Sequence, residues 1–328
     1  MRRVFVTGGG GVVGGAILER LVARGDEVVA LARSDESAQA VAARGATVVR
    51  GDVLDEDAVA RGMEGCSLAF HVAGINKMCV QDPAHMRRVN VDGSVAAVRA
   101  ASRAGVARLV YTSSAATLGE PPGVVGNEHT PHRGWYLSVY EHTKTDAERA
   151  VLEAAGEAGQ DVVCANPSSV QGPGRSGGTA RFLLAFLDGR LKYFVQTNLS
   201  IVDIADCTEG HLLVAERGRR GERYVLNSVN LTITEALRLG AEIAGVKRNP
   251  RMIPRPVASV AGTVVEGAFR LARRSPPVCR EMVRTLLHGH RYDGSRAERE
   301  LGLRYTSPEE TIRRTVEWAQ SEGLLRSS

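Results

Sequence analysis

The sequence predicts an α/β fold in which helices cover both faces of a parallel sheet. From Val4 to about Ala165, short β-branched apolar runs alternate with alanine-rich segments, and a glycine-rich turn joins the first run to the first helix. Uniformly apolar runs are typical of strands buried on both faces, and regular strand–helix alternation is typical of parallel sheets. After Ala165 the chain becomes rich in Gly, Pro and Ser, which predicts that it leaves this sheet for a smaller C-terminal lobe.

The elements can be placed in order along the chain. Strands are expected at 4–7, 27–32, 47–50, 68–72, 108–112 and 161–165, and later at 200–204 and 222–226. Apolar residues three to four positions apart predict helices at 14–24, 38–44, 55–63, 86–104, 138–157, 179–188, 234–244 and 308–322. We therefore predict a first domain over 1–170, to which the strands near 200–204 and 222–226 return. Residues 171–195 and 228–328 would form the C-terminal lobe.

One further helix is expected between Val257 and Ala272, where apolar residues recur at helical spacing and Arg270, Arg273 and Arg274 lie near the end. The pattern favours a helix that covers a cleft. A helix lying on a membrane surface is the alternative.

Composition limits the class of protein. The 328 residues are 43% hydrophobic and 24% charged, which is typical of a globular protein with a large core. The net charge is +5, but we interpret the basic residues as spread among 37 acidic ones, which argues against nucleic-acid binding. The five cysteines are odd in number and lack C-x-x-C spacing, so buried, reduced thiols are expected. The sequence shows no signal peptide and no 18-residue apolar run, which predicts a cytoplasmic protein without membrane insertion.

The strongest local motif lies where the first strand meets the first helix. It reads Thr7-Gly8-Gly9-Gly10-Gly11-Val12-Val13-Gly14. Glycines here let the backbone approach a dinucleotide pyrophosphate, and the free N–H groups of a helix N-terminus attract the anion. The first domain is thus predicted to be a Rossmann-type, doubly wound parallel sheet.

The residues after the second and third strands point to a particular cofactor. Dinucleotide folds that bind NAD place an acid after the second strand, whereas this chain has Arg33. A guanidinium suits a 2′-phosphate, so NADP(H) is predicted in preference to NAD(H), with an ordinary surface arginine as the alternative. After the third strand, Asp52 would accept from the adenine amino group with Val53 beside the ring, and Asp55 would cap the next helix.

The residues expected to carry chemistry are Tyr140 and Lys144, on one face of a helix, and Ser114, at the end of the preceding strand. A phenol with a pKa near 10 needs help to exchange a proton near neutrality, and a neighbouring ammonium favours the phenolate. A serine hydroxyl can hold a carbonyl oxygen on which charge develops. This set predicts proton and hydride exchange at a carbonyl or alcohol.

Over nearly its full length the sequence resembles an extended short-chain dehydrogenase/reductase of the NAD-dependent epimerase/dehydratase superfamily. The resemblance rests on the glycine motif, Asp52-Val53, His71-Val72-Ala73-Gly74, Asn90-Val91-Asp92-Gly93, Thr112-Ser113-Ser114, Tyr140-x-x-x-Lys144, Asn166-Pro167-Ser168-Ser169-Val170-x-Gly172-Pro173 and a closing segment at 291–302. It implies that Ser114 is the catalytic serine, Tyr140 the acid/base and Lys144 its partner and a ribose ligand. It also implies cofactor contacts from Val72, Ala73, Gly74, Pro167, Ser169 and Val170, and a homodimer formed through the helices at 86–104 and 138–157.

Within the superfamily the chain is similar to dihydroflavonol reductases, 3β-hydroxysteroid dehydrogenases and hopanoid-associated sugar epimerases. Sugar-nucleotide enzymes usually carry an arginine and a histidine in the element that matches 198–206, and both are missing here. This absence favours a reductase acting on a small, apolar or acidic molecule. A redox-neutral sugar or nucleotide-sugar epimerase or dehydratase with tightly held cofactor, and a non-catalytic nucleotide-binding regulator, stay as alternatives.

Other conspicuous residues are expected to have lesser roles. His71 would pack near the cofactor, and Asn76, Met78 and Cys79 are candidates for substrate contact. His129-x-x-His132 and His288-x-His290 are interpreted as surface-loop histidines, because no acid or cysteine completes a metal-ligand set at fitting spacing. No metal is expected.

Overall fold

The computed structural model describes residues 2–325, so residues 326–328 of the expected C-terminal lobe lie outside it. Within 2–325, seven parallel strands form one sheet in the order β10-β6-β5-β4-β1-β2-β3. They are β1 Arg3–Thr7, β2 Glu27–Ala32, β3 Thr47–Arg50, β4 Leu68–His71, β5 Arg108–Thr112, β6 Val162–Pro167 and β10 Arg223–Leu226. The predicted Rossmann-type α/β fold is thereby confirmed.

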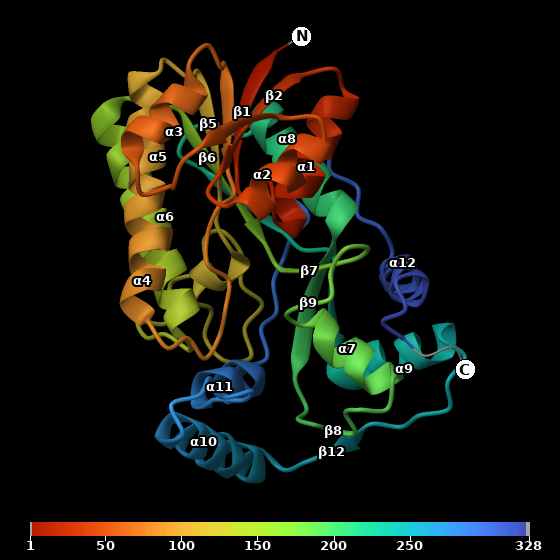
Figure 1. The fold of residues 1–328 in the computed structure, drawn as a ribbon. Helices are drawn as coiled ribbons and strands as arrows, with labels where there is room; N and C mark the ends of the chain where they lie inside the picture. Colours follow the sequence, from red (N-terminus) through yellow and green to blue (C-terminus); the bar gives the residue numbers. More distant parts are fainter. Residues whose placement is uncertain (1, 326–328) are drawn as a thin grey trace.

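Helices cover both faces of this sheet (Figure 1). On one face lie α1 Val12–Ala23, α2 Asp35–Ala43 and α8 Ile204–Arg217, and on the other α3 Glu56–Met63, α5 Gly93–Arg103 and α6 Val139–Ala158. Alternate residues of β1 supply the two cores, since Val4 and Val6 pack against the first set and Phe5 against the second. Strands buried on both faces explain why the apolar runs in the sequence are continuous.

The helix expected at 86–104 is broken into three parts. These are α4 Pro83–Arg87, a π-helical turn over Arg88–Asp92, and α5. The turn carries Asn90, whose amide exchanges hydrogen bonds with the backbone of Ile75 and donates to Thr143 Oγ1 at 3.1 Å. The π turn therefore joins the segment after β4 to α6, which is a common use of such turns at functional sites.

A second, three-stranded sheet has the order β11-β9-β7, made of β7 Ser169–Gln171, β9 Asn198–Asp203 and β11 Val229–Thr232. The strand expected at 200–204 belongs here, paired with β7 and β11, and not to the main sheet. The strand expected at 222–226 does return to the main sheet as β10. Two short strands, β8 Tyr193–Phe194 and β12 Arg251–Met252, pair separately.

The remaining helices build the C-terminal lobe. Leu184, Leu237 and Ile312 share one core, contributed by α7 Ala180–Leu187, α9 Ile233–Ile243 and α12 Pro308–Ser321. The helix predicted at 257–272 is α10 Arg255–Leu271, and it packs on α11 Arg280–His288 at the end of the molecule away from the N-terminus (Figure 1). Short turns lie at Ala115–Leu118 and Ala297–Leu301.

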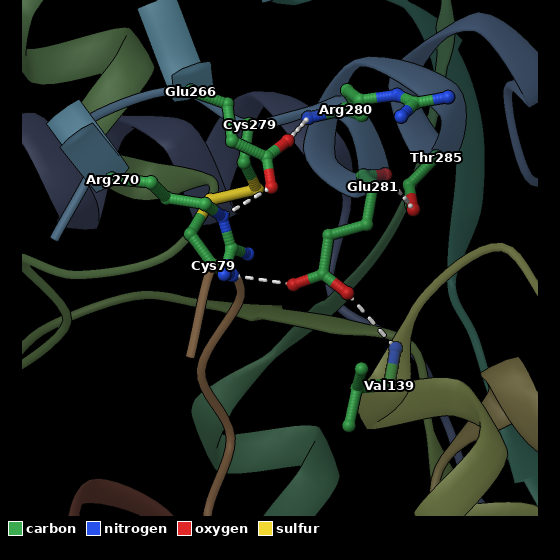
Figure 2. Close-up of a disulfide and its surroundings, with 8 residues drawn as sticks. All are labelled: Cys79, Val139, Glu266, Arg270, Cys279, Arg280, Glu281 and Thr285. Carbon is green, nitrogen blue, oxygen red and sulfur yellow. Dashed lines mark hydrogen bonds and ion pairs between the residues drawn. A yellow bond between two sulfur atoms is a disulfide. The ribbon is translucent and has the colours of Figure 1, made fainter. Parts of the chain in front are cut away.

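The expectation of five reduced thiols is wrong. Cys79 and Cys279 form a disulfide across 200 residues, while Cys66, Cys164 and Cys207 are buried and free. The bond joins the segment after β4 to the N-terminus of α11 (Figure 2). No spacing rule could link these two cysteines, because only the docking of α11 brings their Cα atoms to 5.7 Å.

No helix within 2–325 combines the length and the apolar character needed to span a bilayer.

Candidate functional site

A cavity of about 1530 Å³ opens at the carboxyl ends of β1, β4 and β5 and continues between the main sheet and the C-terminal lobe. Almost all of the predicted site residues line it: Gly8, Gly10, Gly11, Val12, Val13, Gly14, Arg33, Asp52, Val53, Val72, Ala73, Gly74, Asn76, Met78, Ser114, Tyr140, Lys144, Pro167, Ser169 and Val170. Thr7 and Cys79 do not. The carboxyl edge of a parallel sheet, where strand order reverses, is the usual ligand site of such folds.

Two glycines of the turn, Gly8 and Gly14, have no room for a side chain. A Cβ atom on Gly8, which has φ +74°, would lie 2.7 Å from the amide nitrogen of Ala73, and one on Gly14 would lie 2.2 Å from the carbonyl oxygen of Gly8. The first turn of α1 holds no acid, and its N-cap, Gly11, makes no side-chain hydrogen bond. The bare N–H groups and the helix dipole thus face the cavity, and this fits the pyrophosphate of a dinucleotide.

Thr7 supports this turn from behind. Its Oγ1 accepts hydrogen bonds from the amides of Val72 and Ala73, both at 3.2 Å, and lies 3.0 Å from His71 Nδ1. The hydroxyl proton is therefore donated to His71 Nδ1, so His71 carries its proton on Nε2. Burial, with a smaller contribution from Lys144, lowers the pKa of His71 to about 3 and keeps the ring neutral. His71 thus packs in a structural network, as the sequence indicates.

Arg33 and Asp52 lie at the far end of the same cavity. Arg33 Nη1 is 3.4 Å from Asp52 Oδ2, and Asp52 Oδ1 accepts the amide of Leu54. Ser34, beside Arg33, caps α2 through the amide of Ser37. The guanidinium of Arg33 can pair with an anion, whereas the first turn of α2 beside it already carries the carboxylates of Asp35 and Glu36. Asp55 caps α3 through the amide of Ala58, as expected.

Ser114 and Tyr140 meet at the centre of the cavity. Ser114 lies two residues after β5 and caps the turn at Ala115–Leu118, where its Oγ accepts the amide of Ala116. Burial raises the pKa of Tyr140, while a hydrogen bond with Ser114 and the positive charge of Arg175 act in the opposite direction. Arg175 was not expected as a site residue. It follows the Gly-Pro segment after β7, and its Nε is buried without a hydrogen-bond partner among the described residues.

Lys144 lies one helical turn beyond Tyr140, with its ammonium directed at the strand behind it. Lys144 Nζ donates to Tyr111 Oη and to the carbonyl of Thr112, both at 2.8 Å. Burial lowers the pKa of Lys144 to about 8, although the carboxylate of Glu148 acts in the opposite direction by favouring the charged ammonium. The Lys144 ammonium, which the sequence placed beside the Tyr140 phenol, is thus held between β5 and α6. The positive charge that acts on the pKa of Tyr140 is that of Arg175.

A buried polar network fixes the turn that carries Ser114. Glu148 on α6 accepts from Asn166 Nδ2 and Thr117 Oγ1 with one oxygen and from Arg223 Nη1 with the other. Asn166 also donates to the carbonyl of Ser114 at 3.2 Å. Sequence reasoning did not assign Glu148 and Arg223 to the site. Only their burial marks these two residues as part of the site, and burial cannot be seen before the tertiary structure is known.

The C-terminal lobe closes the cavity through α11. Met282 and Leu286 line the cavity, and Glu281 accepts the backbone amides of Cys79 and of Val139, next to Tyr140, at 2.5 and 2.9 Å (Figure 2). Cys79 does not line the cavity, since its sulfur is bonded to Cys279. Asn76 and Met78 do line it, as expected.

The surface-loop interpretation is wrong for His288 and His290. Both rings hydrogen-bond to Glu120 Oε1, at 3.1 and 2.6 Å, and the side chain of His288 is almost fully buried. Burial of Glu120 opposes ionisation, but the two histidines bring its pKa down to about 2. An acid does therefore complete this group. It is more than 160 residues away in sequence, so spacing could not reveal it. His129 is exposed, as predicted.

Comparison with known proteins agrees with the site. The sequence model of the NAD dependent epimerase/dehydratase family matches residues 4–227. The chain is 32% identical to sterol demethylase protein B of Methylococcus capsulatus, over 98% of this chain and 99% of the relative. It is 33% identical, over 92% and 91%, to 4-hydroxy-2-methyl-3-oxo-4-farnesyl-3,4-dihydroquinoline-1-oxide ketoreductase of Stigmatella aurantiaca. Among solved structures, gox2253 superposes with a TM-score of 0.87 at 30% identity, covering 99% of this chain and all of the other.

The glycine cradle, the order of the strands and these full-length similarities agree with one another. The chain belongs to the NAD-dependent epimerase/dehydratase family and is an oxidoreductase of the extended short-chain dehydrogenase/reductase type.

Proposed function

We propose that this protein transfers a hydride, with NADP(H), between the nicotinamide and a ketone or secondary alcohol of a small, largely apolar metabolite. The observation that carries the proposal is the placement of Ser114, Tyr140 and Lys144 on the same cavity as the glycine cradle. A dinucleotide lying from the cradle towards Tyr140 would bring its reactive ring to these side chains.

Each side chain has a distinct part in the proposed reaction. The hydroxyl of Ser114, which hydrogen-bonds with Tyr140, would donate to the substrate oxygen and hold it as charge develops there. Tyr140 gives its proton to that oxygen in reduction and takes it back in oxidation. Lys144, anchored by Tyr111 and Thr112, holds a positive charge on the same helix face and would contact the ribose of a bound cofactor.

The bound cofactor would supply the hydride. Its pyrophosphate would lie against the turn from Gly10 to Val13, which lines the cavity at the N-terminus of α1. Val72, Ala73, Gly74, Pro167, Ser169 and Val170 would border the ribose and nicotinamide, and Asp52 and Val53 the adenine. Arg33 supports the preference for NADP(H), because a guanidinium can pair with a 2′-phosphate and cannot accept from a ribose diol.

The walls of the cavity beyond Tyr140 support an apolar substrate. Met78, Phe182, Leu191, Leu199, Val278, Met282 and Leu286 line it. The Stigmatella relative is named for reduction of a ketone on a farnesylated ring, which is a molecule of this kind. We propose the same reaction class here, with Asn76 and Met78 contacting substrate.

The test is Tyr140→Phe. The variant keeps the ring and loses only the proton-transferring hydroxyl, so we expect ketone reduction by NADPH to fall by about 10²- to 10⁴-fold. The NADPH dissociation constant, from fluorescence titration, should change little. Tyr136→Phe is the matched control, since Tyr136 stacks on His142 outside the cavity and should leave turnover unchanged. Comparable turnover in Tyr140→Phe would overturn the mechanism.

One observation favours a second candidate, a redox-neutral epimerase acting on a nucleotide-sugar. Arg175, Arg181 and Arg190 all line the cavity and could hold a diphosphate, although 198–206 lacks the arginine typical of such enzymes. The two candidates differ in how firmly the cofactor is held. Nucleotide released by denaturing freshly purified protein, identified by mass spectrometry, separates them. Near-stoichiometric NAD⁺ supports the epimerase, and an empty protein that prefers NADPH supports the reductase.

The broader organisation is proposed on the same basis. Residues 1–170 with β10 hold the cofactor, and 171–195 and 228–325 shape the substrate end of the cavity. We propose that the protein is cytoplasmic, where its Cys79–Cys279 disulfide would be an uncommon feature. We also propose a homodimer through α5 and α6, which size-exclusion chromatography with light scattering would test.

A further inference from the structure

The helix α10 exposes an apolar stripe that no described residue covers. Val257, Val260, Val264 and Leu271 are 53, 64, 63 and 90% exposed, and the smaller Ala261 and Ala268 are exposed beside them. These six residues follow the spacing 0, 3, 4, 7, 11 and 14, so they occupy one face of the helix.

This face is distinct from the face by which α10 is attached to the protein. Ala258 and Gly262 are buried against α11, where a Cβ atom on Gly262 would lie 2.7 Å from Val283. Polar residues Arg255, Ser259, Thr263 and Arg270 separate the two apolar faces on one side of the helix. Burial by the fold therefore does not account for the valines of the outer stripe.

The charge around α10 is strongly one-sided. Residues 247–280 contain eight cations, all exposed, namely Lys247, Arg248, Arg251, Arg255, Arg270, Arg273, Arg274 and Arg280. Glu266 is the one carboxylate in this range. It is occupied by Arg270 and by the backbone amide of Arg280 (Figure 2). Eight cations and one carboxylate give this segment a net charge of 8 − 1 = +7, which is larger than the +5 of the whole chain. It is the exception to an otherwise even distribution of charge.

An exposed apolar helix face, in a segment with cations before and after it along the chain, is complementary to an anionic lipid surface. We propose that α10 lies on the surface of a bilayer that contains anionic phospholipid. The outer stripe would enter the acyl boundary and the arginines would pair with lipid phosphates. A second copy of this chain fits the face poorly, because the same eight cations would oppose one another.

The location of α10 would bring a bound bilayer close to the apolar end of the cavity. α11 lies between α10 and the cavity, since Val283 of α11 meets Gly262 while Met282 and Leu286 line the cavity. A bilayer on α10 would therefore be one helix away from the apolar end of the cavity, where an apolar metabolite dissolved in lipid could be taken up. The surface contact itself does not depend on the reaction proposed above.

Vesicle co-sedimentation of the purified full chain tests the proposal. We expect the protein to pellet with phosphatidylcholine vesicles that contain phosphatidylglycerol, to stay in solution with phosphatidylcholine alone, and to be released by high salt. Val260→Asp with Val264→Asp should weaken binding to the mixed vesicles by at least about tenfold. Arg273→Gln with Arg274→Gln should weaken it less.

A matched control separates the stripe from simple charge. Val124→Asp with Val125→Asp adds the same two charges at residues that are 43 and 44% exposed on another segment, and should bind nearly as well as wild type. Val260→Ser with Val264→Ser should also lose binding, which covers the case of a destabilised aspartate variant. Absence of pelleting, or equal binding by the valine variants of α10 and the control, would overturn the proposal. So would a wild-type dimer, in sedimentation velocity without lipid, that Val260→Asp dissociates.

Discussion

At the scale of single residues, burial is the largest influence on the pKa values of His71, Lys144 and Tyr140. His71 is kept neutral by burial, and Lys144 has a pKa of about 8 for the same reason. For Tyr140, a hydrogen bond with Ser114 and the positive charge of Arg175 oppose the effect of burial, which raises its pKa. The residue that tunes the proposed acid/base therefore comes from a Gly-Pro loop after β7 and not from the helix that carries Tyr140.

Removing that charge should move the pH profile. The guanidinium of Arg175 favours the phenolate, so Arg175→Gln is expected to raise the pKa of Tyr140. Alcohol oxidation needs the phenolate as base, so the rising limb of kcat/KM against pH should move to higher pH. Arg181→Gln is the control, because Arg181 lines the cavity but does not act on the pKa of Tyr140. An unmoved limb in Arg175→Gln, or equal displacement in both variants, would contradict this role.

Cofactor preference is a second question at this scale. Arg33→Asp should weaken NADPH by at least about tenfold, because a carboxylate repels the 2′-phosphate, and should leave NADH unchanged or slightly tighter. Arg50→Asp is the comparison, since Arg50 ends the neighbouring strand and does not line the cavity. Dissociation constants for both cofactors, measured by titration calorimetry, give the ratio. An unchanged preference would show that Arg33 is an ordinary surface arginine.

At the scale of elements, the disulfide and Glu281 attach α11 to the cofactor domain. The disulfide fixes the N-terminus of α11 to the segment that carries Asn76 and Met78. Glu281, two residues further on, holds the amides of Cys79 and Val139, so one helix end contacts both walls of the cavity (Figure 2). This placement means that the position of Met282 and Leu286 depends on a link between residues far apart in sequence.

Cleaving this link should cost stability. A bond that closes a loop of 200 residues limits the unfolded chain strongly, so Cys279→Ser should lower the free energy of unfolding by about 2–4 kcal/mol. Urea denaturation with and without reductant measures the effect, and reductant should change the wild type but not the variant. Alkylation of the denatured, non-reduced wild type should label three cysteines. Labelling of all five would show that the bond does not form.

At the scale of the whole molecule, local patterns predicted the main sheet with small errors. The strands at 27–32, 47–50 and 108–112 have the expected bounds, because apolar runs buried on both faces are unambiguous. The strand at 198–203 was placed in the wrong sheet, since strand propensity does not specify a partner. The prediction also omitted α11, a helix of nine residues in which Met282, Val283, Leu286 and Leu287 recur at helical spacing.

The sequence by itself indicated the glycine turn before α1 and the placement of Tyr140 and Lys144 on one face of α6, because both depend on residues a few positions apart. A glycine turn at a helix N-terminus and an i, i+4 pair are local geometry. Tertiary structure decided the rest. The Cys79–Cys279 bond, the charge of Arg175 near Tyr140, the Glu148 network and the contact of Glu120 with His288 and His290 join residues from distant segments. Coulombic forces and hydrogen bonds act over a few ångströms in space, so separation along the chain carries no information about them.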